Sequence, residues 1–300
     1  MNYDVYMHGQ ILGTHSFLLK GEFLQPDEYS ELKAKYFLPG GETGTAATVL
    51  SSLGAAVKID GTHIGTEVAP LLKEFYKDKT VDLSSLYFDS DYEGLMDYVI
   101  IAGPVRSPMG VFQSLYEEGA KKRWNMPKEE DIKNCKVAAI DPYFMEETQA
   151  AAELCVKYNK PFVTIDCRHD SYLHKHCAVN VVSKECTGSE QYKDKSIEEI
   201  YELLTDNTDG LVIITRGEKE MLYGRKGQPM KIMTPFSVEV KSTLGAGDTF
   251  KAGCVYGLLN DMSDGEIVRF ASACSAIAIS RFPLPLNPPT LEEVKELLNG

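Results

Sequence analysis

One glycine-rich run in the sequence has the residue types to bind a phosphoryl group. It reads Thr243-Leu244-Gly245-Ala246-Gly247-Asp248-Thr249-Phe250. The pattern before it predicts a strand at 237–241, and the apolar spacing after it predicts a helix. Two glycines around one alanine let the backbone turn sharply, and a helix start carries about half a positive charge. The run therefore predicts an anion site made of backbone N–H groups.

Asp248 indicates which reaction such a site would serve. A carboxylate in a turn that only bound phosphate would repel its ligand. The pairing is consistent if Asp248 faces a substrate hydroxyl and accepts its proton, while the amides stabilise the oxygens of a phosphoryl group in transfer. The spacing alone leaves a second interpretation open, in which Asp248 only favours the start of a helix.

Two other glycine motifs are excluded by single residues. A dinucleotide-binding fingerprint would need glycine at position 250, where Phe250 stands. A Walker loop would need Gly-Lys-Ser/Thr, which neither this run nor Gly40-Gly41-Glu42-Thr43-Gly44 contains.

The elements that must position this run alternate along the chain. Strands are expected at 4–8, 56–60, 98–101, 136–140, 161–165, 178–182 and 211–215, and helices at 45–53, 68–77, 146–158 and 196–204. Such alternation predicts one three-layer α/β domain over 1–300, with a central, mostly parallel sheet flanked by helices. The segments 12–39 and 81–115 do not fit the alternation, and we expect them to form a small β lid.

Composition limits the partners. The 31 basic and 44 acidic residues give a net charge of −13, which disfavours nucleic acid and anionic membrane surfaces. We find no apolar run of 18 residues and no signal peptide at the N-terminus. The seven cysteines are scattered without a C-x-x-C pair, as expected of reduced core thiols in a cytoplasmic protein.

Four segments together resemble the ribokinase (PfkB-type) carbohydrate kinase family. The run 243–250 is similar to the family's C-terminal signature, and the segment from Gly40 to Gly54 to its N-terminal one. Residues 214–219 resemble the strand and turn beside the nucleotide, and 289–294 the closing helix. In character the chain is closest to ketohexokinase-like members.

The resemblance implies a ribokinase-like fold, ATP as donor, Mg²⁺ as cofactor and a small sugar-like acceptor. It also implies a homodimer formed through the lid. Asp248 maps onto the catalytic base, and Gly245, Ala246 and Gly247 map onto the anion hole. The nucleotide contacts implied are Thr215, Gly217, Thr243, Gly245 and Gly247.

The acceptor positions depart from the family pattern. Family sugar kinases have Asp at the place of Thr14 and Asn at the place of Thr45. Threonine can still bond a hydroxyl, but it is shorter than asparagine and carries no charge. The acceptor is therefore a less usual sugar, or not a sugar. Glu42, beside Gly41, could supply the missing carboxylate, or it is a solvated loop acid.

Two further residues are assigned from their positions relative to the family's motifs. The family motif that orders Mg²⁺ reads Ser183-Lys184-Glu185-Cys186 here, so Glu185 would serve one position early unless it is a surface acid. Arg106 matches a lid arginine that faces the family's active site, or it is an ion-paired surface arginine.

Two alternatives to a sugar kinase stay open. One is a nucleotide- or sugar-binding regulator without activity, which Thr14 and Thr45 favour and the intact Gly245 to Asp248 run disfavours. The other is a kinase for a nucleoside or a vitamin-like alcohol.

Overall fold

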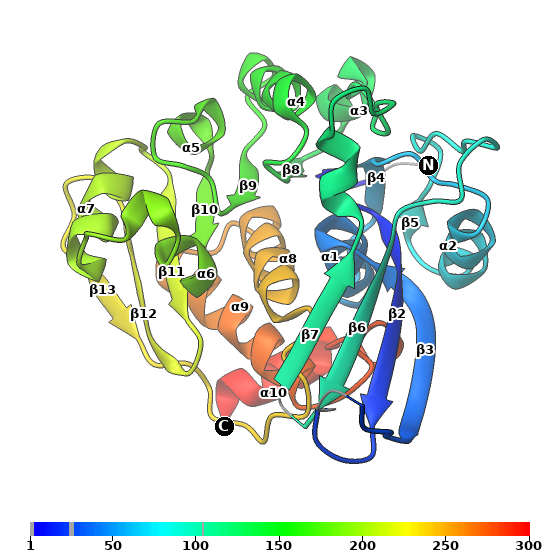
Figure 1. Cartoon of the computed structure of the whole chain (residues 1–300). Coiled ribbons are helices and arrows are strands. Elements are labelled where there is room, and N and C mark those ends of the chain that lie inside the picture. Colours follow the sequence, from blue (N-terminus) through cyan, green and yellow to red (C-terminus); the bar gives the residue numbers. More distant parts are fainter. Residues whose placement is uncertain (1–2, 24–26, 104) are drawn as a thin grey trace.

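Two β-sheets organise the chain in the computed structural model, which describes residues 3–23, 27–103 and 105–300 (Figure 1). The large sheet has nine strands in the order β13-β12-β11-β10-β9-β8-β1-β4-β5, and the small sheet has four in the order β3-β2-β6-β7. The architecture confirms the α/β prediction.

The large sheet is parallel from β5 to β11. Its strands are β1 (Val5–Gly9), β4 (Val57–Gly61), β5 (Val81–Asp82), β8 (Val137–Ile140), β9 (Phe162–Ile165), β10 (Val179–Val182), β11 (Leu211–Arg216), β12 (Lys219–Gly224) and β13 (Lys231–Met233). β1 lies between β4 and β8, with Val5 opposite Val57 and Val137. β12 pairs antiparallel with both of its neighbours, β11 and β13.

Helices cover both faces of this sheet because successive strand residues point to opposite sides. Val5 and Met7 join the core that includes α1 (Glu42–Ser52), α8 (Ala246–Leu259) and α9 (Asp264–Ile279), whereas Tyr6 packs with residues of α3 (Glu129–Asn134) and α4 (Met145–Lys157). The other helices are α2 (Val68–Tyr76), α5 (Tyr172–His176), α6 (Lys184–Thr187), α7 (Ile197–Asp206) and α10 (Leu291–Asn299), with short 3₁₀ turns at Phe112–Tyr116, Glu190–Tyr192 and Leu284–Leu286.

The small sheet consists of β2 (Leu12–Leu19), β3 (Leu32–Gly40), β6 (Met96–Ala102) and β7 (Val105–Gly110). Its strands lie together (Figure 1), and β3 packs against α1 and α2. The expected lid segments 12–39 and 81–115 contain these strands, together with residues 24–26 and 104, which lie outside the described residues. The start of the second segment, β5, pairs with β4 in the large sheet instead.

One strand prediction is wrong. Residues 237–241 form no strand. The N–H groups of Lys241 and Ser242 donate to the carbonyl of Ile279 at 2.8 and 3.2 Å, so the segment is bonded to the end of α9 and not to a neighbouring strand. The β12–β13 hairpin was not predicted from the sequence.

Two boundary features are informative. α1 begins at Glu42, three residues before the predicted start, which brings the glutamate into its first turn. Thr290 and Glu293 form a capping box at the start of α10, in the segment that resembles the family's closing helix. No helix in the described part of the chain is both long and apolar enough to cross a membrane, and all seven cysteines are free thiols.

Candidate active site

A cavity of about 240 Å³ lies where the small sheet meets the starts of α1 and α8. Seven of the residues that the sequence analysis singled out line it: Thr14, Gly41, Glu42, Thr45, Arg106, Gly245 and Asp248. Four segments far apart in the sequence thus converge on one space. The cavity also has walls that the sequence analysis missed, including Gln10, Ser16, Asp97 and the segment 282–285.

Two glycines allow the helix starts to approach this space. Gly41, the N-cap of α1, has φ 78°, and a Cβ there would lie 2.6 Å from the carbonyl oxygen of Gln10. Gly245, the N-cap of α8, has φ 80°, and its Cβ would lie 3.1 Å from Cγ2 of Thr45. Side chains rarely adopt this left-handed region, so both turns depend on glycine.

The start of α8 leaves backbone donors unused. The first helical bond runs from Thr249 N–H to the carbonyl of Gly245, at 2.9 Å. The N–H of Ala246 is in use, because it donates to the carbonyl of Thr243 at 3.2 Å. A Cβ on Gly247 would meet no heavy atom within 4 Å. The open space at Gly247 adjoins the positive end of the helix, which suits an anion.

Asp248 stands at the third position of α8 and is half-buried. Burial raises the pKa of its carboxyl, the charge of Asp141 raises it further, and the charges of Lys251 and Arg106 oppose the rise. A carboxylate with a raised pKa is a stronger proton acceptor than an exposed aspartate.

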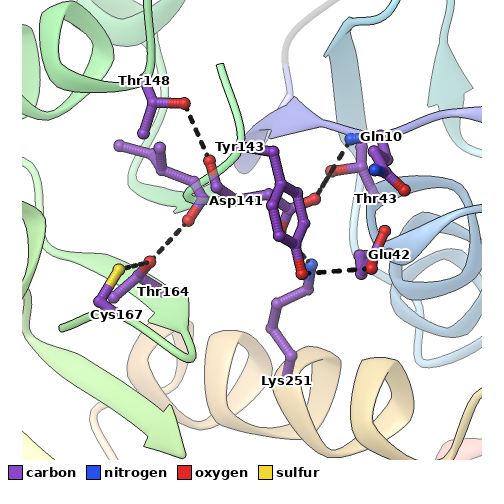
Figure 2. A network of polar contacts seen from close by, with 10 residues as sticks. Gln10, Glu42, Thr43, Asp141, Tyr143, Thr148, Thr164, Cys167 and Lys251 are labelled. Carbon is purple, nitrogen blue, oxygen red and sulfur yellow. Dashed lines mark hydrogen bonds and ion pairs between the residues drawn. The ribbon is translucent and has the colours of Figure 1, made fainter. Parts of the chain in front are cut away.

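Glu42 forms the second acidic group of the cavity. The hydroxyl of Tyr143 donates to its Oε1 at 3.3 Å (Figure 2), whereas its Oε2 is buried without a partner. Burial is the main cause that raises the pKa of Glu42 to about 8, and the charges of Asp248 and Asp141 add to it. The carboxyl therefore stays largely protonated near neutral pH.

The charges of a fully buried ion pair act on the carboxyls of both Glu42 and Asp248. Lys251 Nζ lies 2.5 Å from Asp141 Oδ1, and neither side chain is exposed. Asp141 Oδ2 accepts bonds from the hydroxyl of Thr43 at 2.8 Å and the N–H of Gln10 at 3.3 Å (Figure 2). Lys251 follows Asp248 by three residues, which places both on one face of α8.

Sequence reasoning missed this pair. The partners are 110 residues apart, and a lysine in a helix is usually solvated. One signal was present, because Asp141 directly follows β8 at the carboxyl edge of the sheet, where α/β sites open.

The remaining candidates lie outside the cavity, along the same edge of the sheet. Thr215 Oγ1 donates to the carbonyl of Val182 at 3.3 Å, and Gly217 occupies the exposed turn between β11 and β12 with φ 68°. Thr243 is half-buried just before α8. Glu185 is exposed in the first turn of α6.

Asp166 connects this second region to the cavity. Its carboxylate accepts bonds from the N–H and hydroxyl of Ser183, at 2.7 and 2.9 Å. Burial raises the pKa of Asp166, and the charge of Glu185 raises it further. Asp166 in turn raises the pKa of Asp248. The carboxyl ends of β8, β9 and β10 thus carry a row of acids leading to Asp248.

Comparison with known proteins shows the family of the chain. The model of the pfkB family of carbohydrate kinases matches residues 20–285. The 5-dehydro-2-deoxygluconokinase of Clostridium botulinum is 24% identical over 285 residues, which cover 86% of this chain and 83% of that protein.

Solved structures share the fold. The ribokinase of Arabidopsis thaliana, complexed with ribose and ATP, aligns with a TM-score of 0.79 at 16% identity and covers 100% of both chains. The nucleoside kinase of Methanocaldococcus jannaschii aligns with a TM-score of 0.78 at 16% identity, covering 100% of this chain and 98% of that one.

Proposed function

Because the chain belongs to the pfkB family and is a carbohydrate kinase, we propose that it transfers the γ-phosphoryl group of ATP to a hydroxyl of a small sugar-like acceptor. The observation that carries the proposal is the position of Asp248. Its carboxyl lines a cavity of small-molecule size and belongs to the first turn of a helix whose amides suit a phosphoryl group.

Asp248 is the proposed base. It takes the proton of the acceptor hydroxyl as the new O–P bond forms and the bond from the γ-phosphorus to the bridging oxygen of ADP breaks. Its raised pKa favours this transfer. Thr14, Gly41, Glu42 and Thr45 would hold the acceptor, because they line the same cavity.

The amides at the start of α8 form the proposed anion hole. Gly245 and Gly247 are the main donors, and the open space over Gly247 leaves room for the transferring group. The Ala246 amide bonds Thr243 in this conformation, so its contribution requires that turn to open. Arg106, an exposed cation on β7 at the cavity wall, would contact the phosphoryl oxygens from the lid.

Thr215, Gly217 and Thr243 would border the nucleotide, together with the glycines of the anion hole. The acids nearby fit Mg²⁺. In the described residues no cluster of three or more His, Cys, Asp or Glu is arranged as a metal site, but Mg²⁺ needs only one or two carboxylates with water and phosphate. Glu185, with Asp166 beside it, would hold the ion, and the ion when bound would neutralise phosphate charge.

We also propose a cytoplasmic homodimer formed through the lid. Tyr98, Val105 and Met109 on β6 and β7 are exposed large apolar side chains, and exposed apolar patches mark contact surfaces. Analytical ultracentrifugation should give a dimer for the wild type and a monomer for Tyr98→Glu. A wild-type monomer at micromolar concentration would contradict the interface.

The reaction is tested by ADP release from MgATP across ketoses, aldoses, polyols, sugar acids and nucleosides. We expect one class of acceptor to stimulate ADP release, and phosphorus NMR to show a phosphate ester on the acceptor. ATP binding without any acceptor-stimulated ADP release would favour the regulator instead. A nucleoside as the best acceptor would favour the nucleoside kinase.

A further inference from the structure

The charges that line the cavity are unbalanced. Among the described lining residues, Glu42, Asp97 and Asp248 carry carboxyl groups, and Arg106 carries the one cation. The carboxyls come from different elements: Glu42 from α1, Asp97 from β6 and Asp248 from α8. An acceptor molecule in the cavity is therefore surrounded by acidic groups.

Two of these carboxyls have an unused oxygen. Oε2 of Glu42 and Oδ1 of Asp97 are buried, and neither has a hydrogen-bond partner in the described protein. Asp97 stands opposite Thr14 in the lid sheet, and the Thr14 hydroxyl bonds its carboxyl. A buried acceptor without a donor is unfavourable, so both oxygens call for hydrogen-bonding groups on a ligand.

The nearby cations do not offset these acids. Lys251 is paired with Asp141 below the cavity. Arg106 is exposed, and its charge acts on Asp248, whose pKa it lowers. Arg106 is the one cation in the described lining, against three carboxyl groups, and the proposed function assigns it to the phosphoryl oxygens.

Glu42 itself indicates the electrostatic field in the cavity. Burial and the charges of Asp248 and Asp141 raise its pKa to about 8, and Lys251 opposes this only in part. A carboxylate or phosphate brought in by an acceptor would be desolvated and repelled by the same groups.

We propose that the acceptor carries no negative charge and presents hydroxyl or ammonium groups to Glu42 and Asp97, so that sugar acids and sugar phosphates are excluded. The inference rests on the proposed function, because it takes this cavity as the acceptor site. It narrows the acceptor to uncharged polyols and sugars or to amino sugars.

The test compares acceptors that differ at one carbon. The pairs are D-glucitol with D-gluconate, D-glucose with D-glucuronate, and D-glucose with D-glucosamine, and D-fructose is compared with D-fructose 6-phosphate. We expect kcat/KM for D-glucitol, D-glucose and D-fructose to exceed that of the acidic partner of each by about 100-fold, the scale of a like-charge contact in a buried site. The glucosamine pair separates a hydroxyl requirement from an ammonium requirement.

Two variants test the named residues. Glu42→Gln and Asp97→Asn keep the shape of each side chain and remove its carboxyl group. They are compared with the wild type at pH 9, above the pKa of about 8 of Glu42, so that this carboxyl is ionised in the wild type. Each variant should lower the ratio of kcat/KM for the uncharged acceptor to kcat/KM for its acidic partner by about tenfold. Glu74→Gln is the matched control, because Glu74 is an exposed acid on α2 that pairs with Lys77, and it should leave the ratio unchanged.

The outcomes separate this inference from the proposed function. Preferred turnover of an acidic member overturns the inference and leaves the kinase intact, as does an unchanged ratio in both variants. If no acceptor is turned over, calorimetric binding of the same pairs decides. Tighter binding of the uncharged member supports the inference, whereas tighter binding of the acid, or no binding at all, overturns it.

Discussion

Burial raises the pKa of both Glu42 and Asp248, the two carboxyls at the helix starts of the cavity. Each begins a helix whose positive end would stabilise its charge. The pKa of Glu42 is nevertheless raised to about 8, because the side chain is buried and because the negative charges of Asp248 and Asp141 act on it. Glu42 can therefore hold a proton and donate a hydrogen bond to the acceptor near neutral pH, while Asp248 is the proposed base.

The raised pKa of Glu42 predicts a pH-dependent stability. The unfolded glutamate ionises near its ordinary value of 4.5, whereas the folded one holds its proton to about pH 8. The folded state therefore binds more protons between these values, and stability falls as pH rises through that window. Glu42→Gln should remove this loss of stability. The melting temperature of the variant relative to that of the wild type should therefore rise from pH 5 to pH 8.

Differential scanning fluorimetry at pH 5, 6, 7 and 8 measures this difference. Glu74→Gln, an exposed acid, serves as control. A constant offset between Glu42→Gln and the wild type across this range would contradict the raised pKa.

The buried pair of Asp141 and Lys251 predicts a large effect on stability. Lys251→Met keeps most of the side-chain volume and leaves the Asp141 carboxylate buried without its cation. Removing one member of a buried pair costs about 3–5 kcal/mol. Urea unfolding should show this loss, and the double variant Asp141→Asn with Lys251→Met should recover most of it. Wild-type stability of Lys251→Met would contradict the pairing.

At this scale the sequence was informative only where a motif was local. Asp248 and its glycines lie within one run, and their type and spacing indicate their chemistry. Asp97 and Asp141 could not be assigned, because their roles arise from neighbours on other elements. Asp97 depends on the pairing of β2 with β6, and Asp141 depends on Lys251, 110 residues away.

At the scale of elements, the site depends on two helix starts that meet. α1 and α8 pack against each other, and the glycine N-caps Gly41 and Gly245 bring their first turns to the cavity. Gly245 and Asp248 line this cavity, whereas Ala246 and Gly247, the two residues between them, do not.

A substitution at Gly247 should change activity without lowering stability, because the space beside this residue is open. A Cβ there meets no heavy atom within 4 Å, so Gly247→Ala should leave the melting temperature equal or slightly higher, as glycine replacement in a helix does. The added methyl group would occupy the proposed place of the phosphoryl group, and kcat should fall at least about tenfold.

Gly265→Ala is the matched control. Gly265 holds the same second position in α9, and its Cβ would meet only the Tyr223 hydroxyl, at 3.6 Å. This variant should keep both stability and activity. Full activity of Gly247→Ala would contradict the proposed anion hole.

The elements themselves were largely predictable, because alternating strands and helices have distinct hydrophobic periods. The failures have physical causes. Residues 237–241 have the composition of a strand, but their backbone bonds the end of α9. The β12–β13 hairpin lies at the edge of the sheet and its residues are partly exposed, so its hydrophobic pattern is weak.

At the scale of the whole molecule, Gln10, which follows β1 at the carboxyl edge of the large sheet, and residues of the small sheet line the same cavity. The sheet edge brings Asp141, Asp166 and Glu185 into one row, and the lid adds Thr14, Asp97 and Arg106. The segments 12–39 and 81–115 were expected to form a small β lid because they leave the α/β alternation, and the family resemblance added the expectation that the lid forms a dimer interface.

The most direct test of the account is the isosteric variant Asp248→Asn. It removes the proposed proton acceptor and keeps the side-chain shape. We expect kcat for the best acceptor to fall by about 10²–10⁴, with the melting temperature and the calorimetric affinities for ATP and acceptor close to those of the wild type. Turnover within about threefold of the wild type would contradict Asp248 as the base, because general-base catalysis contributes far more than that.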